Sequence, residues 1–528
     1  MSTAASSAGS RSAVELPRPL SHLLSAAIVT VVGILLVHVL FETWAQDLTG
    51  PTSDDPLAEL DNTAQWPKQL TNLLYLGLAA LTMLKVAIDR LWKRFRTAAD
   101  LALLVLGLVM VLAGVVNDSA PSLMGQAVFV YFRDVLVFYA LRAADLRPAM
   151  IRRLLLVVAA VVGLNLFLAL VQAVVGPPAY RALGWTDLTW ADQSRAQGLQ
   201  SHPNHLGHLL GLTILGFMAW AAVQQRVRRG WWAVAAVVAL ALSATQSLES
   251  LLGVLVAGVL IAVLVRGSAR RVLAVCLIVV LCTAAQIAVQ PDHRAEWERR
   301  LGNALPGGHH PAGSEQRPAT PVREIRVLYL QQAADILPRQ PLLGFGLGQF
   351  GGVVAEKHDP DWHRNPKFGP NGFNRYGVQD VQIESFWLHL VMEVGVLGGI
   401  AFVVWLFFVV RPLVRATRRG RRRTRQPPAP SATVVWAIGA MVFAAVVALF
   451  SPAFEDPLFP ALLWTVLGLA WWAWRRSREE AASLHSAPTA MLPVVRDPSD
   501  VREADTRILD TDEILALARR ARALRGRS

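Results

Sequence analysis

Long apolar runs, separated by short polar or charged stretches, recur along most of the chain. A helix needs about 20 mostly apolar residues to cross the hydrocarbon core of a bilayer. The alternating segments of about 10 residues that build a membrane β-barrel are absent. The pattern therefore predicts an all-α polytopic membrane protein with about 12 transmembrane helices. The predicted spans are residues 22–42, 68–88, 99–116, 124–142, 152–175, 204–224, 231–246, 248–265, 271–290, 384–410, 433–451 and 457–474.

One polar stretch is much longer than the other connections and divides the spans into two bundles. It is predicted to form a large extracytoplasmic loop with short helices, because apolar residues recur at helical spacing over 322–337. The chain then has five predicted regions. They are a disordered cytoplasmic N-terminal tail at 1–21, a bundle of about nine spans at 22–290, the loop at 291–383, a bundle of about three spans at 384–475, and a cytoplasmic tail at 476–528.

The net charge of +13 is concentrated at the ends of the spans. This distribution follows the positive-inside rule, so it requires no nucleic-acid partner. It also predicts that both termini lie in the cytoplasm and that the large loop lies outside. The basic segments assigned to the cytoplasmic side are 89–96, 142–153, 226–229, 266–271, 415–425 and 474–478.

Cysteine and histidine give no evidence for a metal site or a disulfide framework. Cys276 and Cys282 are the only cysteines and lie six positions apart within one apolar run. We interpret them as thiols inside a helix. The loop histidines lack a regular ligand spacing. We therefore predict neither a metal nor a cofactor.

Arg195 begins a polar segment directly before the sixth predicted span. The segment continues through Gly198, His202 and Asn204. His202 or Asn204 can cap the helix that follows Pro203. One interpretation is a loop with a capped helix. The other is an anion-binding site, because an arginine and a helix N-terminus both favour negative charge.

Three further arginines are candidates for binding an anionic substrate. Arg133 lies within the fourth span beside Asp134. A charge at that depth is costly and indicates either a function or a structural ion pair. Arg323 and Arg326 are three residues apart on the predicted loop helix and therefore share a face. Two guanidinium groups on one face can clamp a diphosphate, whereas the alternative is a solvated basic face.

Carboxylates near the spans and a glycine-rich segment complete the candidates. Glu384 begins the tenth span and could act as a general base or as an N-terminal helix charge. Glu249 and Glu393 lie within spans, where ionisable groups usually face the bundle interior. The segment GFGLGQFG (344–351) resembles a nucleotide loop, but it follows a helix and lacks the Walker lysine.

Three motifs together resemble the family of O-antigen ligases and O-antigen or exopolysaccharide polymerases. The first is Arg195-Ala-Gln-Gly198 followed by His202-Pro203-Asn204. The second is Arg326, a helix, and then the segment QPLLGFGLGQF at 340–350. The third runs from Glu384-Ser385 to Glu393-Val394-Gly395. Ligases of the family typically have His-Asn where this chain has Glu384-Ser385, so a role of that histidine would pass to Glu384 or elsewhere.

The resemblance implies a GT-C-like membrane glycosyltransferase in the bacterial cytoplasmic membrane, with an extracytoplasmic active site and no metal. The donor would be an undecaprenyl-diphosphate-linked glycan, and the acceptor a glycan or a lipid-linked sugar. Arg195 and Arg326 would stabilise the leaving diphosphate, and Glu384 is the candidate general base. Arg133, Gly198, His202, Asn204 and Arg323 are the candidate substrate-binding residues. The alternatives are a transporter or flippase of lipid-linked glycans and an envelope scaffold.

Overall fold

The structure is a computed structural model that describes residues 19–49, 66–289, 294, 325–373, 383–423 and 431–486. Met1–Arg475 form one compact unit and Arg476–Ser528 form a second. The described part of the second unit is the C-terminal stretch of one helix, residues 476–486. The candidate residues that the structure describes all belong to the first unit.

The described residues form helices and connections, with no strand among them. The helices before the large loop are α1 (Pro19–Thr49), α3 (Trp66–Ile88), η1 (Leu91–Phe95), α4 (Ala98–Val116), α5 (Pro121–Phe132), α6 (Val135–Ala143), α7 (Pro148–Val175), α8 (Pro177–Ala182), α9 (Thr189–Asp192), α10 (Pro203–Val223), α11 (Arg229–Ala244), α12 (Leu248–Leu264) and α13 (Ala269–Val289). The loop and the chain after it contribute α15 (Ile325–Ile336), η2 (Leu337–Arg339), α16 (Val353–His358), η3 (Trp362–Arg364), η4 (Pro366–Phe368), α17 (Phe386–Arg423), α18 (Ala432–Val447) and α19 (Leu458–Ser486).

Each predicted span coincides with a helix or a helix pair, which confirms the all-helical class for the described residues. Among the described residues, seven helices are long and apolar enough to cross a membrane, or eight if the bent pair α5 and α6 counts as one span. The apolar helices α11, α12 and α18 are shorter. At 1.5 Å per residue, α11 reaches only about 24 Å, less than the hydrocarbon thickness of about 30 Å. The larger number of about 12 spans stays a prediction.

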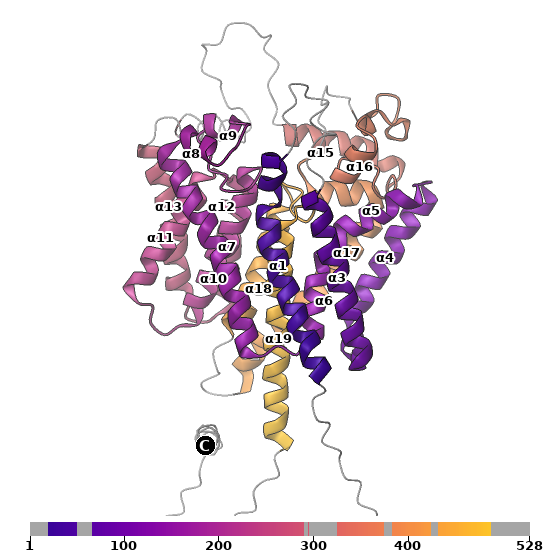
Figure 1. The fold of residues 1–528 in the computed structure, drawn as a ribbon. Helices are drawn as coiled ribbons and strands as arrows, with labels where there is room; N and C mark the ends of the chain where they lie inside the picture. The colour runs from indigo at the N-terminus through magenta and orange to yellow at the C-terminus, as the bar shows by residue number, and fades with distance from the viewer. Residues whose placement is uncertain are drawn as a thin grey trace, which may run out of the picture. The chain divides into compact units, whose positions relative to one another are not determined.

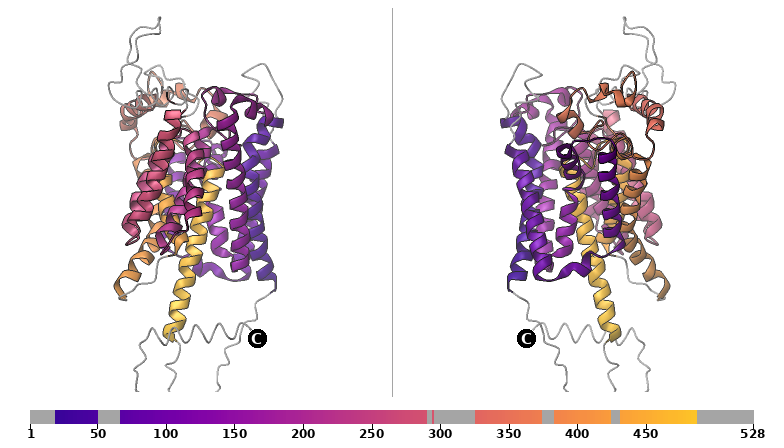
Figure 2. Two further views of the ribbon diagram at one scale, coloured as in Figure 1. Left: turned by 90° about the vertical axis from the view of Figure 1, so that its left-hand side faces the viewer. Right: turned by 90° about the vertical axis from the view of Figure 1, so that its right-hand side faces the viewer.

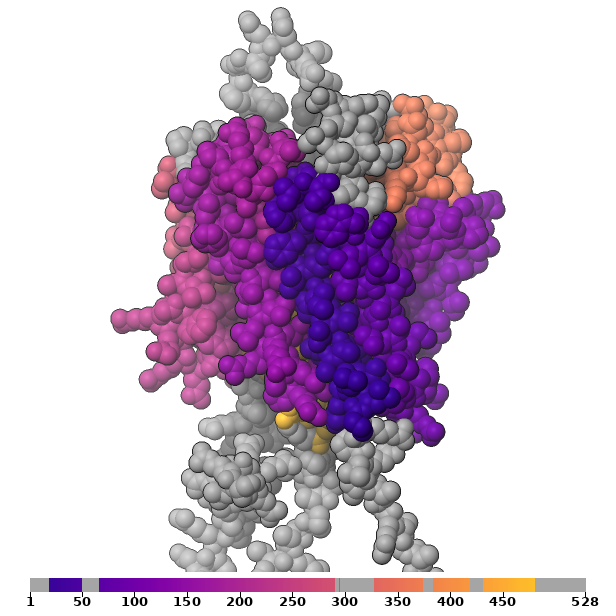
Figure 3. Space-filling view, in the orientation of Figure 1, coloured from indigo at the N-terminus to yellow at the C-terminus, as the bar shows by residue number. Residues whose placement is uncertain are grey.

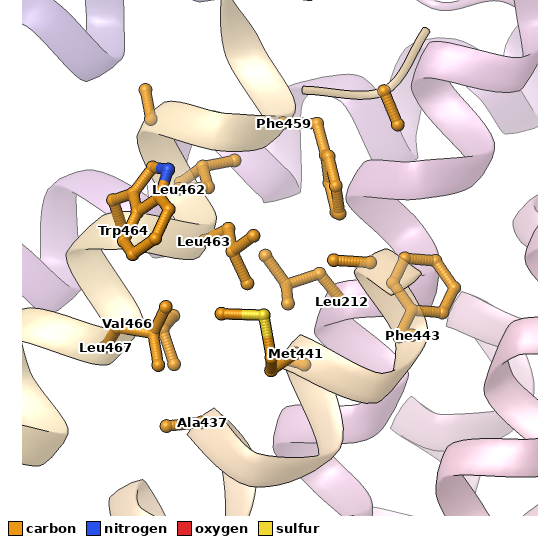
Figure 4. Packing of buried hydrophobic residues seen from close by; sticks show 14 of the residues in the cluster. Leu212, Ala437, Met441, Phe443, Phe459, Leu462, Leu463, Trp464, Val466 and Leu467 are labelled. Carbon is orange, nitrogen blue, oxygen red and sulfur yellow. The ribbon is translucent and has the colours of Figure 1, made fainter. Parts of the chain in front are cut away.

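The long helices of the first unit lie side by side and run in one general direction (Figures 1 and 2). α1 packs against both α3 and α7, and the space-filling view shows it between them (Figure 3). α17 packs against α4. Buried side chains of α10, α18 and α19, including Leu212, Met441 and Leu463, meet in the core (Figure 4).

α17 is broken at Gly395, where the backbone has φ 69° and ψ −174°. The glycine-rich segment of the large loop fills this break. The backbone N–H of Phe345 donates to the Met392 carbonyl at 2.8 Å, and that of Val396 donates to Pro341 at 2.9 Å. In a bilayer, groups released from a helix need such internal partners. The loop is therefore held against α17 by backbone contacts.

Candidate functional site

The segment that carries Arg195 is held by polar side chains of α7. The Gln172 side-chain oxygen accepts from the N–H groups of Gln197 and Gly198, at 3.0 and 2.7 Å. The Asn165 side-chain oxygen accepts from the Leu199 N–H at 3.2 Å. Both side chains are buried. An irregular backbone needs hydrogen-bond partners inside a membrane. Asn165 and Gln172 supply these partners from the otherwise apolar helix α7.

The Arg195 side chain is 3% exposed and is held by neighbours that include Thr245, Asn204 and Trp190. Its Nε donates to the Thr245 carbonyl at 3.1 Å, and its Nη2 donates to the Asn204 side-chain oxygen at 2.8 Å. The guanidinium carbon lies 5.1 Å from the centre of the Trp190 ring. Thr245 lies in the three-residue break between α11 and α12, which are too short to fill the full thickness. The cation is therefore preorganised beside the turn that joins these two short helices.

The Arg195 backbone has its own partner in α8. The Tyr180 hydroxyl donates to the Arg195 carbonyl at 2.6 Å. Burial raises the pKa of the Tyr180 phenol above its usual range. The phenol consequently stays protonated and keeps donating at any working pH, which holds the carbonyl in place.

The structure brings Gly198, His202 and Asn204 to the same segment as Arg195. His202 is the N-cap of α10, and its Nδ1 accepts from the Asn204 N–H at 3.0 Å. The capping prediction is thereby confirmed for His202. Asn204 instead orients the guanidinium of Arg195. Gly198 has φ +63°, a conformation that favours glycine.

Arg133 lies at the break between α5 and α6, which bend by 61°. The fourth predicted span is thus not one straight helix. Asp134 accepts a hydrogen bond from the Tyr75 hydroxyl of α3, and the Arg133 Nε lies 3.6 Å from an Asp134 carboxylate oxygen. The Arg133 Nη2 also donates to the Glu455 carbonyl at 3.4 Å. These contacts between distant segments, rather than a proline or glycine, accompany the break.

The other three candidates lie on or beside the large loop. Glu384 is half-buried directly before α17. Next to it, the Ser385 hydroxyl accepts from the Leu388 N–H at 3.4 Å and caps the helix. Arg326 belongs to α15, but its side chain lies outside what the structure describes, and Arg323 lies outside the described residues. The diphosphate clamp of these two arginines therefore stays a prediction.

Sequence reasoning missed three histidine–carboxylate pairs in the bundle. The pairs are His208 Nε2 with Glu249 Oε1 at 2.8 Å, His389 Nδ1 with Glu455 Oε1 at 2.7 Å, and His205 Nδ1 with Asp456 Oδ1 at 3.8 Å. The signal was the presence of ionisable residues within or beside apolar runs. It was strong for α10, where His202, His205 and His208 recur every three residues.

The apolar helices and the buried charged side chains define a helical membrane protein with polar groups in its interior, and the described part of the large loop and α8 lie at the same end of the bundle (Figure 1). Residues 233–403 match a family model described as O-antigen ligase. The chain therefore carries a domain of the O-antigen ligase family, and the resemblance predicted from its motifs is confirmed. No curated protein matches the chain.

The family match supports a polysaccharide ligase role and covers only part of the candidate site. It begins in α11 and ends in α17, so it includes Arg326 and Glu384. Arg133 and Arg195 lie before it. The matched region therefore does not include the preorganised guanidinium of Arg195.

Proposed function

We propose that this protein transfers a glycan from an undecaprenyl-diphosphate-linked donor to an acceptor hydroxyl at the outer face of the bacterial cytoplasmic membrane. The observation that carries the proposal is the preorganised guanidinium of Arg195, in a chain with an O-antigen ligase domain. Negative charge grows on the diphosphate as the anomeric bond breaks. A fixed cation aimed at that charge is often the largest catalytic contribution.

An apolar groove between α1 and the N-terminal part of α7 supports a donor with a long lipid tail. A cavity of about 620 Å³ lies between α1 and α7 and is lined largely by apolar residues, among them Val29, Val37, Phe41 and Leu154. Near the Phe41 end of the groove, the Gln200 side chain of the Arg195 segment donates to the Leu40 carbonyl at 3.3 Å. The tail would lie in this groove while the diphosphate approaches Arg195.

Arginine suits this role because it stays protonated at any working pH and presents several donors. We expect Arg195→Ala to lower glycan transfer by about 100- to 1,000-fold, by analogy with the loss of one oxyanion donor. Arg195→Lys keeps the charge and loses the fork of donors, so it should rescue only part of the activity. The matched control is Arg181→Ala, because Arg181 is an exposed arginine in nearby α8.

The measurement is the size distribution of envelope glycans in a deletion strain complemented with each variant. Single repeat units on the acceptor, without long chains, would indicate a polymerase. Full-length chains that accumulate on the lipid carrier would indicate a ligase. Arg326→Ala tests the second arginine in the same strain. An unchanged glycan profile after deletion would remove the transferase proposal and favour a transporter or a scaffold.

A further inference from the structure

The connection between α18 and α19 places two neighbouring carboxylates inside the bundle. Glu455 and Asp456 are 6% and 7% exposed. Glu455 pairs with His389 of α17, and Asp456 faces His205 of α10. Buried charges are costly and are a weak device for stability. Two of them in one short connection, each facing a histidine, indicate a polar centre that joins α10 to α17.

The His389 imidazole has one nitrogen fixed and the other without a hydrogen bond. Its Nδ1 lies 2.7 Å from the Glu455 carboxylate. Its Nε2 has no hydrogen-bond partner among the described residues, although the side chain is fully buried. A carboxylate at Nδ1 selects the tautomer that carries the proton there, which leaves the Nε2 lone pair able to accept a proton. This is the arrangement of a histidine base with an orienting carboxylate.

The glycine-rich loop covers this pair. A Cβ atom on Gly352 would lie 3.1 Å from the Glu455 Oε2 and 3.3 Å from the His389 Nδ1. The absence of a side chain at position 352 therefore lets the loop backbone approach the pair. The Phe350 ring lies against the same imidazole, with ring centres 6.4 Å apart. Because His389 is enclosed, an acceptor reaches it only when this part of the loop moves.

The charged and titratable groups around His389 come from α17 itself, from α5 and from the break between α5 and α6. Glu393 lies one turn along α17, and its Oε2 accepts from the Tyr131 hydroxyl of α5 at 3.0 Å. The Arg133 guanidinium reaches the Glu455 carbonyl at 3.4 Å. Glu455 thus contacts both the Arg133 cation, through its carbonyl, and His389, through its carboxylate. The Arg133 cation and the histidine–carboxylate pair therefore belong to one connected network.

We propose that His389, oriented by Glu455, is the base that takes the proton from the acceptor hydroxyl. The inference rests on the transferase function proposed above. The hydroxyl oxygen bonds to the anomeric carbon as its proton moves to the His389 Nε2. The bond from the anomeric carbon to the diphosphate oxygen breaks, and its electron pair leaves with the diphosphate. The imidazolium, balanced by Glu455, then returns the proton to water. This places the base at His389 rather than at Glu384.

The test separates proton transfer from a structural bond. His389→Asn places an amide near the Nδ1 position, where it can still donate to Glu455, but it has no basic nitrogen. We expect it to lower kcat by about 100-fold, at the lower end of general-base effects, with KM for the donor within about twofold because binding is untouched. Glu455→Gln keeps an oxygen that can accept from the His389 Nδ1 but removes the negative charge. We expect it to lower kcat less than His389→Asn does. His358→Asn, at an exposed position of α16, is the control.

The assay uses full-length protein in detergent, with the lipid-linked glycan and the acceptor fraction extracted from the deletion strain. Release of polyprenyl diphosphate gives the rate, and thermal unfolding reports folding. If wild type turns over and the His389→Asn variant is equally active, only this inference is overturned. The same holds if Glu384→Gln is the one variant of the two that loses kcat. No turnover by wild type, or an unaffected Arg195→Ala variant, would contradict the proposed function itself. If His389→Asn fails to fold, an unchanged kcat in Glu455→Gln overturns the inference.

Discussion

At Gly198, the segment that carries Arg195 approaches α7 so closely that a side chain has no room. The residue has φ +63°, and a Cβ there would lie 2.7 Å from the Asn165 side-chain oxygen. The same oxygen accepts the hydrogen bond of the Leu199 N–H. Asn165 is therefore both the support of the segment and the obstacle to any substitution. The close packing therefore requires glycine at the last position of Arg195-Ala-Gln-Gly198, whether or not this residue contacts a substrate.

We expect Gly198→Ala to displace the segment and to lower glycan transfer at least tenfold, because Arg195 would leave its preorganised position. The strained backbone alone costs about 1–2 kcal/mol, so the thermal unfolding temperature should also fall. Gly163→Ala in α7 is the matched control, since a Cβ there meets nothing within 4 Å. Equal activity and equal unfolding temperatures in the two variants would contradict the close contact.

At the scale of elements, apolar length predicted the helices well and their irregularities poorly. Every predicted span is helical because burying apolar side chains and pairing all backbone groups are both local requirements in a bilayer. The breaks at Arg133 and Gly395 were read as continuous helix. Each break is accompanied by a contact with a distant segment, namely the Glu455 carbonyl for Arg133 and the Pro341 carbonyl for the backbone after Gly395. Contacts of this kind leave no periodic signal in one sequence.

The candidate site was also predictable only where its contacts are local in sequence. Arg195, His202 and Asn204 meet because they are close in sequence and surround one helix start. Glu455 and His389 are 66 residues apart and were missed, because one reads as a turn residue and the other as an ordinary position in an apolar run. Local chemistry could be predicted, whereas pairing across the bundle required the structure.

We expect Gly395→Ala to weaken the attachment of the glycine-rich loop to α17. The residue has φ +69°, and a Cβ there would collide with the Leu342 backbone. The variant should be cut by protease within residues 325–373 at a rate at least tenfold higher, and it should unfold at lower temperature. Gly125→Ala in α5, where a Cβ meets nothing within 4 Å, is the control. An unchanged digestion pattern would show that the kink does not hold the loop.

At the scale of the whole chain, the basic segments predict which end faces the cytoplasm. Arg228, between α10 and α11, belongs to one of these segments, whereas Arg364 belongs to the large loop. Both are exposed. The proposed reaction requires the loop and the Arg195 segment on the outer side, where a lipid-linked donor meets its acceptor. A test of the orientation is therefore also a test of the proposed function.

Single cysteines test this orientation directly. Cys276 and Cys282, both in α13, are first replaced by serine, and a cysteine is then introduced as Arg364→Cys or Arg228→Cys. We expect a membrane-impermeant maleimide to label position 364 in cells whose outer membrane has been made permeable, and position 228 only after lysis, because retained Lys and Arg clusters mark the cytoplasmic side. The opposite labelling would place Arg195 on the cytoplasmic side and exclude transfer at the outer face. Labelling of both positions before lysis would reveal a leaky preparation, which a cytoplasmic reporter enzyme detects independently.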